Sequence, residues 1–326
     1  MRVLIVRLSA LGDIIQASIV LQFIKKHFND SKIDWICEER FSEILENHPL
    51  INQVIKINLK DKNYLKSLKT LIKARKNEYD LVIDFQGLIK SSIISRIISK
   101  NTIGFDKFSS REALSSLFYK NKFNINYNEN IIIRNLSLAG FALNFKFDKD
   151  EILNKFPCFQ TKISNKNIEK KRILLAPFAS EESKIYDKFN YLASNLSYKE
   201  NEVYVCFGSE KERLKAKEII ANSKAILLDK MSLKELVYFI NSCDLVIGND
   251  SAITHLAWAQ NRPSITLFGN RPSSRNSYQT PVNLVIDTGK KIDAFKIDKT
   301  DFCINEIDPN LIIQKANKLL KTINDG

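Results

Sequence analysis

The sequence is poor in the residues and motifs that mark several common classes of protein. It has nine glycines in 326 residues, and it contains neither the GxGxxG turn of dinucleotide-binding proteins nor a P-loop. Its five cysteines are scattered without a CxxC pair, so neither a zinc site nor a disulfide framework is indicated. No run of about 18 apolar residues occurs, so no membrane-spanning helix is predicted. What remains is a globular chain with thiols typical of a reducing cytosol.

Length and charge narrow the possibilities further. A chain of 326 residues with 44% hydrophobic content exceeds one ordinary core and predicts two domains. The net charge of +13 favours a polyanionic partner, which could be nucleic acid, an anionic membrane surface or a phosphorylated substrate. Because lysine, asparagine and isoleucine are abundant along the whole chain, charge alone does not choose among these partners.

The pattern of apolar runs predicts an α/β protein. Short apolar runs alternate with helical periodicity, which is typical of doubly wound parallel sheets, and the N-terminal run is interpreted as a first strand rather than a signal peptide. A mixed stretch at 145–164 interrupts the pattern and is interpreted as a linker. The predicted strands are 2–7, 32–37, 54–57, 80–84 and 102–105 before it, and 172–176, 202–207, 225–228, 245–248 and 265–268 after it.

These elements predict two domains, 1–155 and 156–326, facing each other across a cleft, the usual place for a ligand. The final helix, 309–323, is a candidate to pack back on the first domain. Few as the glycines are, five of them lie at or just beyond the end of an apolar run, where a backbone must turn sharply or approach a ligand. They are Gly12, Gly87, Gly208, Gly248 and Gly269.

The stretch 244–269, DLVIGNDSAITHLAWAQNRPSITLFG, predicts one strand–loop–helix–strand unit. Its polar loop, with Asp250 and Ser251, would lie at the carboxyl end of a parallel strand, where open sheets bind ligands and helix amides suit a phosphate. The simpler alternative is that either residue only caps the helix. His255, one turn further on, would contact either a phosphate or its own helix.

Other polar residues follow predicted strands in the same way. Asp13 comes after Ser-Ala-Leu-Gly and is either a helix cap or a base facing the cleft. Asp84 and Gln86 end another strand of the first domain. In the second domain, Lys184 lies on a loop after a strand and could neutralise a diphosphate, although a single lysine is more commonly solvated. The other two histidines, His27 and His48, are predicted to lie on the surface.

A basic stripe marks the predicted helix 60–77. Five lysines recur at intervals of three and four, and Leu65, Leu68, Leu71 and Ile72 fall towards the other side. The stripe is either the solvated face of an amphipathic helix or a surface for phosphorylated headgroups. Nucleic-acid binding would need interleaved aromatic residues, which one tyrosine does not provide. The stripe comprises Lys62, Lys66, Lys69, Lys73 and Lys76.

Several of these segments resemble one known family. The opening RVLIVRLSALGDIIQAS, DFQGLIKSS at 84–92, SREALSSLFY at 110–119, KMSLKELVYFI at 230–240 and the 244–269 stretch together look like lipopolysaccharide heptosyltransferases, the type I branch most closely. The resemblance runs in order over nearly the whole chain. It implies a GT-B fold with an acceptor domain and a donor domain. It also implies metal-independent, inverting transfer of L-glycero-D-manno-heptose from ADP-heptose to a Kdo residue on lipid A.

The resemblance also assigns roles to individual residues. Asp13 matches the general base. Lys184, Asp250 and the amides at Ser251 and Ala252 match donor contacts, and Ser180 and His255 fall beside them. Arg111, Lys60 and Lys62 match basic residues that face the acceptor's phosphates in the family. Gln86 is placed on the acceptor side. Glu210 matches a ribose contact and Met231 an adenine contact.

The implied setting is the cytoplasmic face of the inner membrane, with peripheral contact to its anionic surface and no nucleic acid, metal or other cofactor. Alanine stands at 179, where the family often has a hydroxyl residue, and at 252, where it usually has glycine; Ile185-Tyr186 replaces a His-Trp pair. Two alternatives stay open at this point. One is a type II or other metal-independent enzyme of the family, and the other is a polyanion- or membrane-binding protein with an inactive cleft.

Overall fold

The chain forms two compact units. The computed structural model describes residues 1–160, 170–197 and 201–322, and its backbone divides into unit 1 (Met1–Gln160) and unit 2 (Thr161–Gly326). Each unit contains one six-stranded sheet in which every strand pair is parallel. The doubly wound α/β class predicted from the sequence is therefore confirmed for each unit.

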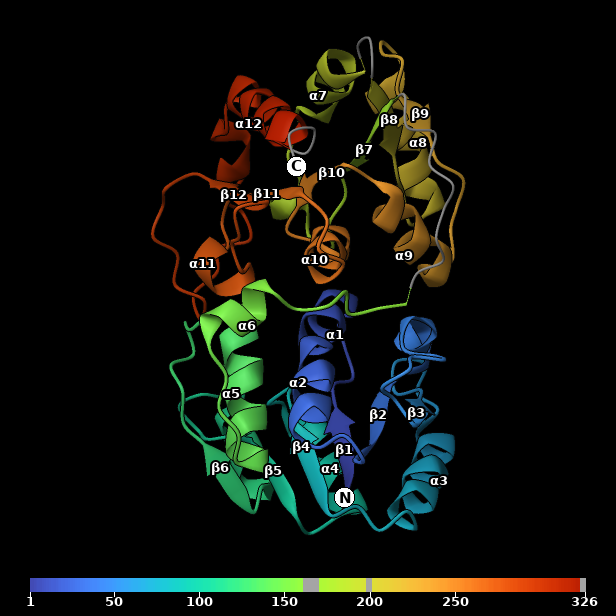
Figure 1. Cartoon of the computed structure of the whole chain (residues 1–326), viewed down its shortest axis with the longest axis vertical. Helices are drawn as coiled ribbons and strands as arrows, with labels where there is room; N and C mark the ends of the chain where they lie inside the picture. The colour runs from blue at the N-terminus through green and yellow to red at the C-terminus, as the bar shows by residue number, and fades with distance from the viewer. Residues whose placement is uncertain (161–169, 198–200, 323–326) are drawn as a thin grey trace. The chain divides into compact units, whose positions relative to one another are not determined.

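The elements of unit 1 alternate as the apolar runs predict (Figure 1). Its strands, numbered in chain order, are β1 (Arg2–Val6), β2 (Lys32–Glu38), β3 (Gln53–Ile57), β4 (Leu81–Asp84), β5 (Thr102–Phe105) and β6 (Asn121–Phe123). Its helices are α1 (Leu11–Ala17), α2 (Ile19–His27), α3 (Tyr64–Arg75), α4 (Ile89–Ile98), α5 (Ile131–Leu143) and α6 (Lys149–Leu153), with 3₁₀ turns η1 (Glu39–Ile44) and η2 (Ala113–Phe118).

Connection handedness fixes which helices cover which face of the unit 1 sheet. The strand order is β3-β2-β1-β4-β5-β6, so the chain moves one way from β1 to β3 and the other way from β3 to β6. Right-handed crossovers then place the early helices on one face and α3, α4 and η2 on the other. The packing agrees, since α2 contacts α5 while α4 contacts both α3 and η2 (Figure 1).

Unit 2 repeats this architecture. Its strands are β7 (Lys171–Ala176), β8 (Asn201–Val205), β9 (Ile226–Leu227), β10 (Leu245–Asn249), β11 (Ser264–Phe268) and β12 (Asn283–Asp287), in the order β12-β11-β10-β7-β8-β9. Its helices are α7 (Phe189–Leu196), α8 (Glu210–Ile220), α9 (Leu233–Ser242), α10 (Ala252–Ala259), α11 (Ser273–Asn276) and α12 (Pro309–Thr322), with 3₁₀ turns η3 (Glu182–Lys184) and η4 (Cys303–Glu306).

The final helix belongs to unit 2. Its apolar residues Ile312, Ala316 and Leu319 are part of the same buried cluster as the strands of the second sheet, and α12 packs on α7, β10 and β11. The expectation that it also packs back on the first domain stays a prediction. Its apolar stripe at intervals of three and four is what the core of its own sheet buries.

Several elements were not predicted. Helix α5 is apolar around most of its circumference, so it lacks the period that marks a surface helix, although Asn130 caps it. Strand β6, of three residues, and strand β12, of five residues, lie at the edges of their sheets. Within the predicted linker, α6 forms with Asp148 as its N-cap, accepting a hydrogen bond from the Glu151 backbone.

One prediction about exposure is wrong, and the apolar side of the predicted basic helix is only partly buried. His48 is buried, with Nε2 2.6 Å from the Cys158 carbonyl, so it is not a surface residue. On α3, only Leu71 of the four predicted apolar residues is buried. Leu65, Leu68 and Ile72 are exposed, because α3 packs through the narrow seam that carries Leu71 and Ala74.

Candidate active site

Both sheets have a topological switch point at their centre. Successive strands are added outward in opposite directions from β1 and β4 in unit 1 and from β7 and β10 in unit 2, and each of these pairs lies at the centre of its sheet. Open parallel sheets bind ligands beyond the carboxyl ends of the strands at this switch point. The predicted site residues after these four strands therefore lie at the positions where a ligand is expected.

In unit 2, the switch point holds a compact charged cluster. Lys184, at the end of η3, places Nζ 2.8 Å from Oδ2 of Asp250, which follows β10. His255, on the first turns of α10, places Nε2 3.2 Å from Oδ1 of the same carboxylate. The side chains of Lys184 and Asp250 are only 15% and 5% exposed. Three residues predicted separately from the sequence thus form one cluster.

The cluster fixes the charge of its carboxylate. Burial by itself would raise the pKa of Asp250, but the Lys184 ammonium and the His255 ring outweigh it and hold that pKa well below its usual range. Asp250 is therefore ionised at neutral pH and accepts hydrogen bonds without donating any. Such a carboxylate can orient Lys184 and His255, or bind a ligand hydroxyl that donates to it.

The backbone around this cluster is held by buried polar contacts. Asn249, fully buried at the end of β10, donates to the Pro177 carbonyl over 2.8 Å and accepts from the Tyr186 amide over 3.2 Å, so it ties β10 to the loop that carries Lys184. Gly248 allows β10 to lie close to β7, since a Cβ there would be 2.8 Å from the Cβ of Ala176. The sequence showed no signal for this role of Asn249.

Ser251 stands at the N-cap position of α10, but its side chain does not cap the helix. Its buried Oγ has no hydrogen-bond partner among the described residues. The N–H groups of the first turn of a helix lack intrahelical partners and attract anions. Ala252 is the first residue of this turn, so a hydroxyl and several amides lie next to the Lys184 cation.

The remaining donor candidates lie at the same edge of the sheet without joining the cluster. Ser180 is exposed on the loop after β7. Glu210 begins α8 after β8 and pairs with Arg213 over 3.0 Å, and Met231 is half-buried after β9. No contact with Lys184 or Asp250 is recorded for these three in the described part of the chain. Their roles towards ribose and adenine stay predictions.

Two further groups near the cluster were not predicted as site residues. Asn276, at the end of α11, places Nδ2 3.5 Å from Oδ2 of Asp250. Glu181, three residues before Lys184, accepts from both Arg271 at 2.9 Å and Lys299 at 3.0 Å, which ties down the loop after β7. The Asn276 contact joins residues 26 positions apart and the Arg271 contact joins residues 90 positions apart, so local sequence pattern could not reveal them.

In unit 1, Asp13 lies at the corresponding switch point. It is the third residue of α1, and its Oδ2 accepts from the Ala10 amide at 3.1 Å and from the Arg7 guanidinium at 2.9 Å. Arg7 is buried and also donates to the Phe85 carbonyl beyond β4. The Asp13 side chain is nevertheless 42% exposed. The Asp13 carboxylate therefore caps the helix start and is also exposed to solvent, and its role as a base facing the cleft stays a prediction.

Its neighbours after β4 are engaged in the scaffold. Gln86 accepts from the Leu8 amide at 2.7 Å and donates to Ser9 Oγ at 3.3 Å, so it links the ends of β1 and β4. Asp84 is fully buried and accepts from the Gln86 amide and the Tyr119 hydroxyl. Burial raises the pKa of Asp84. The expectation that Asp84 opens into a cleft is therefore wrong, whereas Gln86 remains a candidate acceptor contact.

The basic acceptor candidates also follow strands of the unit 1 sheet. Lys60 and Lys62 lie between β3 and α3, and Arg111 lies between β5 and η2; all three side chains are exposed. Together with Gln86 they occupy the three loops that lead into α3, α4 and η2. Their binding role is a prediction, but the fold places all of them at the carboxyl edge of one sheet.

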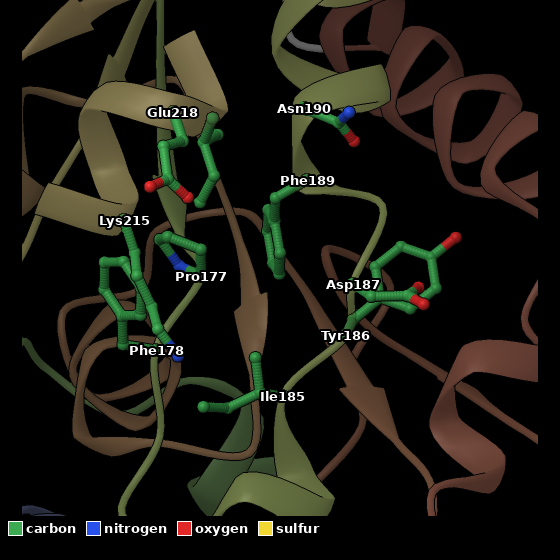
Figure 2. A pocket seen from close by; sticks show the side chains of 10 residues that line it. Pro177, Phe178, Ile185, Tyr186, Asp187, Phe189, Asn190, Lys215 and Glu218 are labelled. Atoms are coloured by element: carbon green, nitrogen blue, oxygen red, sulfur yellow. The ribbon is translucent and has the colours of Figure 1, made fainter.

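A pocket of about 280 Å³ lies beside the Lys184 loop. Figure 2 shows Phe178, Ile185 and Phe189 around it, with Lys215 and Glu218 of α8 along one side. None of the predicted donor residues lines it. It is separate from the charged cluster, although Ile185 follows Lys184 directly.

Among the described residues, no group of three His, Cys, Asp or Glu side chains could hold a metal ion. No described helix is both long and apolar enough to cross a membrane.

Comparison with known proteins places the chain in a family. Residues 68–294 match the family described as glycosyltransferase family 9 (heptosyltransferase). Lipopolysaccharide heptosyltransferase 1 of Campylobacter coli is 46% identical over 98% of this chain and 99% of its own length. The Pseudomonas aeruginosa enzyme of that name is 28% identical over 82% of this chain and 79% of its own length. The chain therefore belongs to glycosyltransferase family 9 and is a homologue of heptosyltransferase I enzymes of lipopolysaccharide core biosynthesis.

Solved structures agree on the fold. The E. coli heptosyltransferase WaaC with ADP has a TM-score of 0.76 at 22% identity and covers 98% of this chain and 97% of its own. E. coli ADP-heptose lps heptosyltransferase II has a TM-score of 0.73 at 18% identity, over 99% of this chain and 100% of its own. These similarities establish the GT-B type of fold, two doubly wound units, and the resemblance seen in the sequence is confirmed.

Proposed function

We propose that this chain transfers L-glycero-D-manno-heptose from ADP-heptose to the Kdo residue of Kdo-lipid A, with inversion and without a metal. The observation that carries the proposal is the buried Lys184–Asp250–His255 cluster. It lies next to the amides of α10 and the Ser251 hydroxyl, which has no hydrogen-bond partner among the described residues. Support also comes from relatives: a structure of the E. coli enzyme WaaC contains ADP, and another contains ADP-2-deoxy-2-fluoro heptose.

The donor half of the reaction needs a place for a leaving diphosphate. The amides at Ser251 and Ala252 and the Lys184 ammonium would bind its oxygens and neutralise the charge that develops as ADP departs with the bonding electrons. Asp250 would keep Lys184 in position and accept a hydrogen bond from a sugar hydroxyl. Ser180, His255, Glu210 and Met231 would complete the site around the phosphates, the ribose and the adenine.

The acceptor half needs a base. A hydroxyl of Kdo would form the new bond to C1 of heptose on the face opposite the departing diphosphate, and its proton would pass to Asp13. The contacts from Arg7 and the Ala10 amide orient this carboxylate, and its exposed surface leaves it reachable. Arg111, Lys60 and Lys62 would bind the acceptor's phosphates, and Gln86 would contact its sugar.

Because the acceptor carries acyl chains, the enzyme would act on the cytoplasmic face of the inner membrane, in peripheral contact with its anionic surface. No nucleic acid or cofactor enters this proposal.

The test is a transfer assay with ADP-heptose in the presence of EDTA. We expect ADP release and heptose incorporation that depend on Kdo-lipid A, with little transfer to an acceptor that already carries its first heptose. Transfer only to the heptosylated acceptor would replace this proposal with a type II activity. Loss of all transfer on EDTA addition, restored by a divalent cation, would refute the metal-independent mechanism.

A further inference from the structure

Helix α3 exposes an apolar stripe that its own unit does not cover. Leu65, Leu68 and Ile72 are 79%, 43% and 51% exposed, and Tyr64 before them is also exposed. Spaced at three and four residues, they share one flank of the helix. In the described part of unit 2, by contrast, no helix carries more than one exposed large apolar side chain. Burying such residues in water-excluding surroundings is favourable, so a stripe of this size indicates a binding surface.

The charge next to the stripe is of one sign. Lys66, Lys69 and Lys73 lie along the adjacent flank of α3 and are all exposed, and no acidic residue occurs between Tyr64 and Arg75. An apolar stripe bordered by lysines is the pattern of a helix that lies in a membrane interface, where lysine stems extend along apolar surface and their ammonium groups reach the phosphates. The same lysines disfavour pairing with a second copy of α3, because like charges would face each other.

The neighbouring elements continue this surface. Helix α3 packs on α4, which packs on η2, and all three cover the same face of the sheet. Ile93 of α4 and Leu114 and Leu117 of η2 are also exposed. The loops that enter these three elements carry the acceptor candidates described above. A lipid-borne acceptor held at those loops would therefore lie at the edge of this face.

We propose that α3 docks on an anionic lipid bilayer, with Leu65, Leu68 and Ile72 entering the level of the headgroups and upper acyl chains and Lys66, Lys69 and Lys73 binding lipid phosphates. The proposal deepens the function proposed above and rests on it for the lipid nature of the acceptor. It identifies the surface that contacts the membrane and adds an apolar component to the electrostatic one.

Vesicle binding by the purified full-length chain tests the proposal. We expect binding to vesicles of phosphatidylcholine mixed with phosphatidylglycerol, little binding to phosphatidylcholine alone, and weakening at high salt. Replacing all three lysines by glutamine should weaken binding on the order of 100-fold, given the contribution expected per basic residue. The matched control removes the same charge from exposed positions on α12 of unit 2, and it should bind like the parent. It combines Lys315→Gln, Lys318→Gln and Lys321→Gln.

The apolar component has its own variants. Combining Leu65→Ser, Leu68→Ser and Ile72→Ser should weaken vesicle binding by about tenfold or more, since three apolar side chains no longer leave water. The control Leu214→Ser with Leu311→Ser, at exposed positions of α8 and α12, should not. Equal losses of vesicle binding in the α3 variants and in their unit 2 controls would overturn the proposal. It would also be overturned if the variants of Leu65, Leu68 and Ile72 lost self-association but kept vesicle binding.

Insertion can be observed directly. The two native tryptophans, Trp35 and Trp258, are buried, so Leu65→Trp adds an exposed reporter on α3. We expect its emission to shift to shorter wavelength on anionic vesicles and to be quenched by brominated acyl chains, while Leu214→Trp shows neither change. Unshifted, unquenched emission on bound vesicles would refute insertion.

Two further measurements separate this proposal from the proposed function. ADP-heptose affinity and thermal unfolding of the α3 variants should equal those of the parent, and transfer to detergent-dispersed acceptor should persist while transfer to vesicle-borne acceptor falls. A chain that docks through α3 but transfers no heptose would refute the proposed function alone. Normal transfer to vesicle-borne acceptor by both α3 variants would refute the docking alone.

Discussion

The two units have the same strand order but place different chemistry at the same switch point. In each, a cation and a carboxylate come together there: Arg7 with Asp13 in unit 1, and Lys184 with Asp250 in unit 2. In unit 1 the cation is buried and the carboxylate is 42% exposed, whereas in unit 2 both partners are largely buried. An exposed carboxylate can exchange a proton with a bound hydroxyl, while a buried, paired one stays charged and fixed. The same fold thus supports a candidate base in one unit and a candidate anion site in the other.

The first way to test this contrast is Asp13→Asn. The amide keeps an oxygen for Arg7 and the Ala10 amide but cannot accept the acceptor's proton, so we expect turnover to fall by about 10²–10⁴-fold. Donor affinity, measured by calorimetry with ADP-heptose, should persist, as should the unfolding midpoint in urea. A parallel loss of donor affinity and turnover would instead make Asp13 structural.

Lys184→Met tests the buried pair. Removing one partner leaves the Asp250 carboxylate buried with less compensation, and we expect the free energy of unfolding to fall by about 3–5 kcal/mol. ADP-heptose binding should weaken as well. The matched control is Arg213→Met, which breaks the exposed pair with Glu210 and should cost about 1 kcal/mol or less. Equal costs in urea unfolding, or unchanged donor affinity, would contradict the roles given to Lys184.

Gly248→Ala tests the close approach of β10 and β7. Its Cβ would be 2.8 Å from Cβ and 2.9 Å from the carbonyl oxygen of Ala176, so backbone must move and we expect a loss of about 1–3 kcal/mol in unfolding free energy. Gly208→Ala is the control, because its Cβ would meet only the flexible end of Glu212. If both variants unfold at the same urea concentration, the strands are not tightly constrained at this point.

Acid should lower the free energy of unfolding through one group in each unit, and the two groups should act over different pH ranges. Burial lowers the pKa of His48 in unit 1, although the hydrogen bond to the Cys158 carbonyl opposes this. As the pH falls, His48 is therefore protonated in the unfolded state before it is protonated in the folded state. The free energy of unfolding is highest above about pH 6.5 and falls below it by up to about 1.4 kcal/mol per pH unit. His48→Gln should flatten this slope in urea unfolding measured across that range.

The lowered pKa of Asp250 acts in the same direction but only in stronger acid. The contribution of Asp250 to the free energy of unfolding is present above the pKa of about 3.9 that an aspartate has in the unfolded state. It is lost as the pH falls towards the lower pKa of the folded state. A stability profile that is flat between pH 6.5 and 5 in the parent chain would contradict the first half of this comparison.

Much of the fold could be predicted because its signals are local. The apolar runs gave most strands, and the stretch 244–269 was correctly interpreted as strand, loop, helix and strand. Asp13, Lys184 and Asp250 were selected because each follows such a run. Helix α5 was missed because a helix buried on nearly all sides has no polar face to give it a period.

The sequence by itself determined the alternation of strands and helices, the family and the polar residues that follow each strand. Only the tertiary structure decided that Lys184 and Asp250 share one buried ion pair, that Asp13 stays exposed while Asp84 does not, and that the apolar stripe of α3 faces outward. The reason is physical. Burial and ion pairing depend on contacts between segments far apart in the chain, whereas periodicity reports only what a residue's near neighbours are.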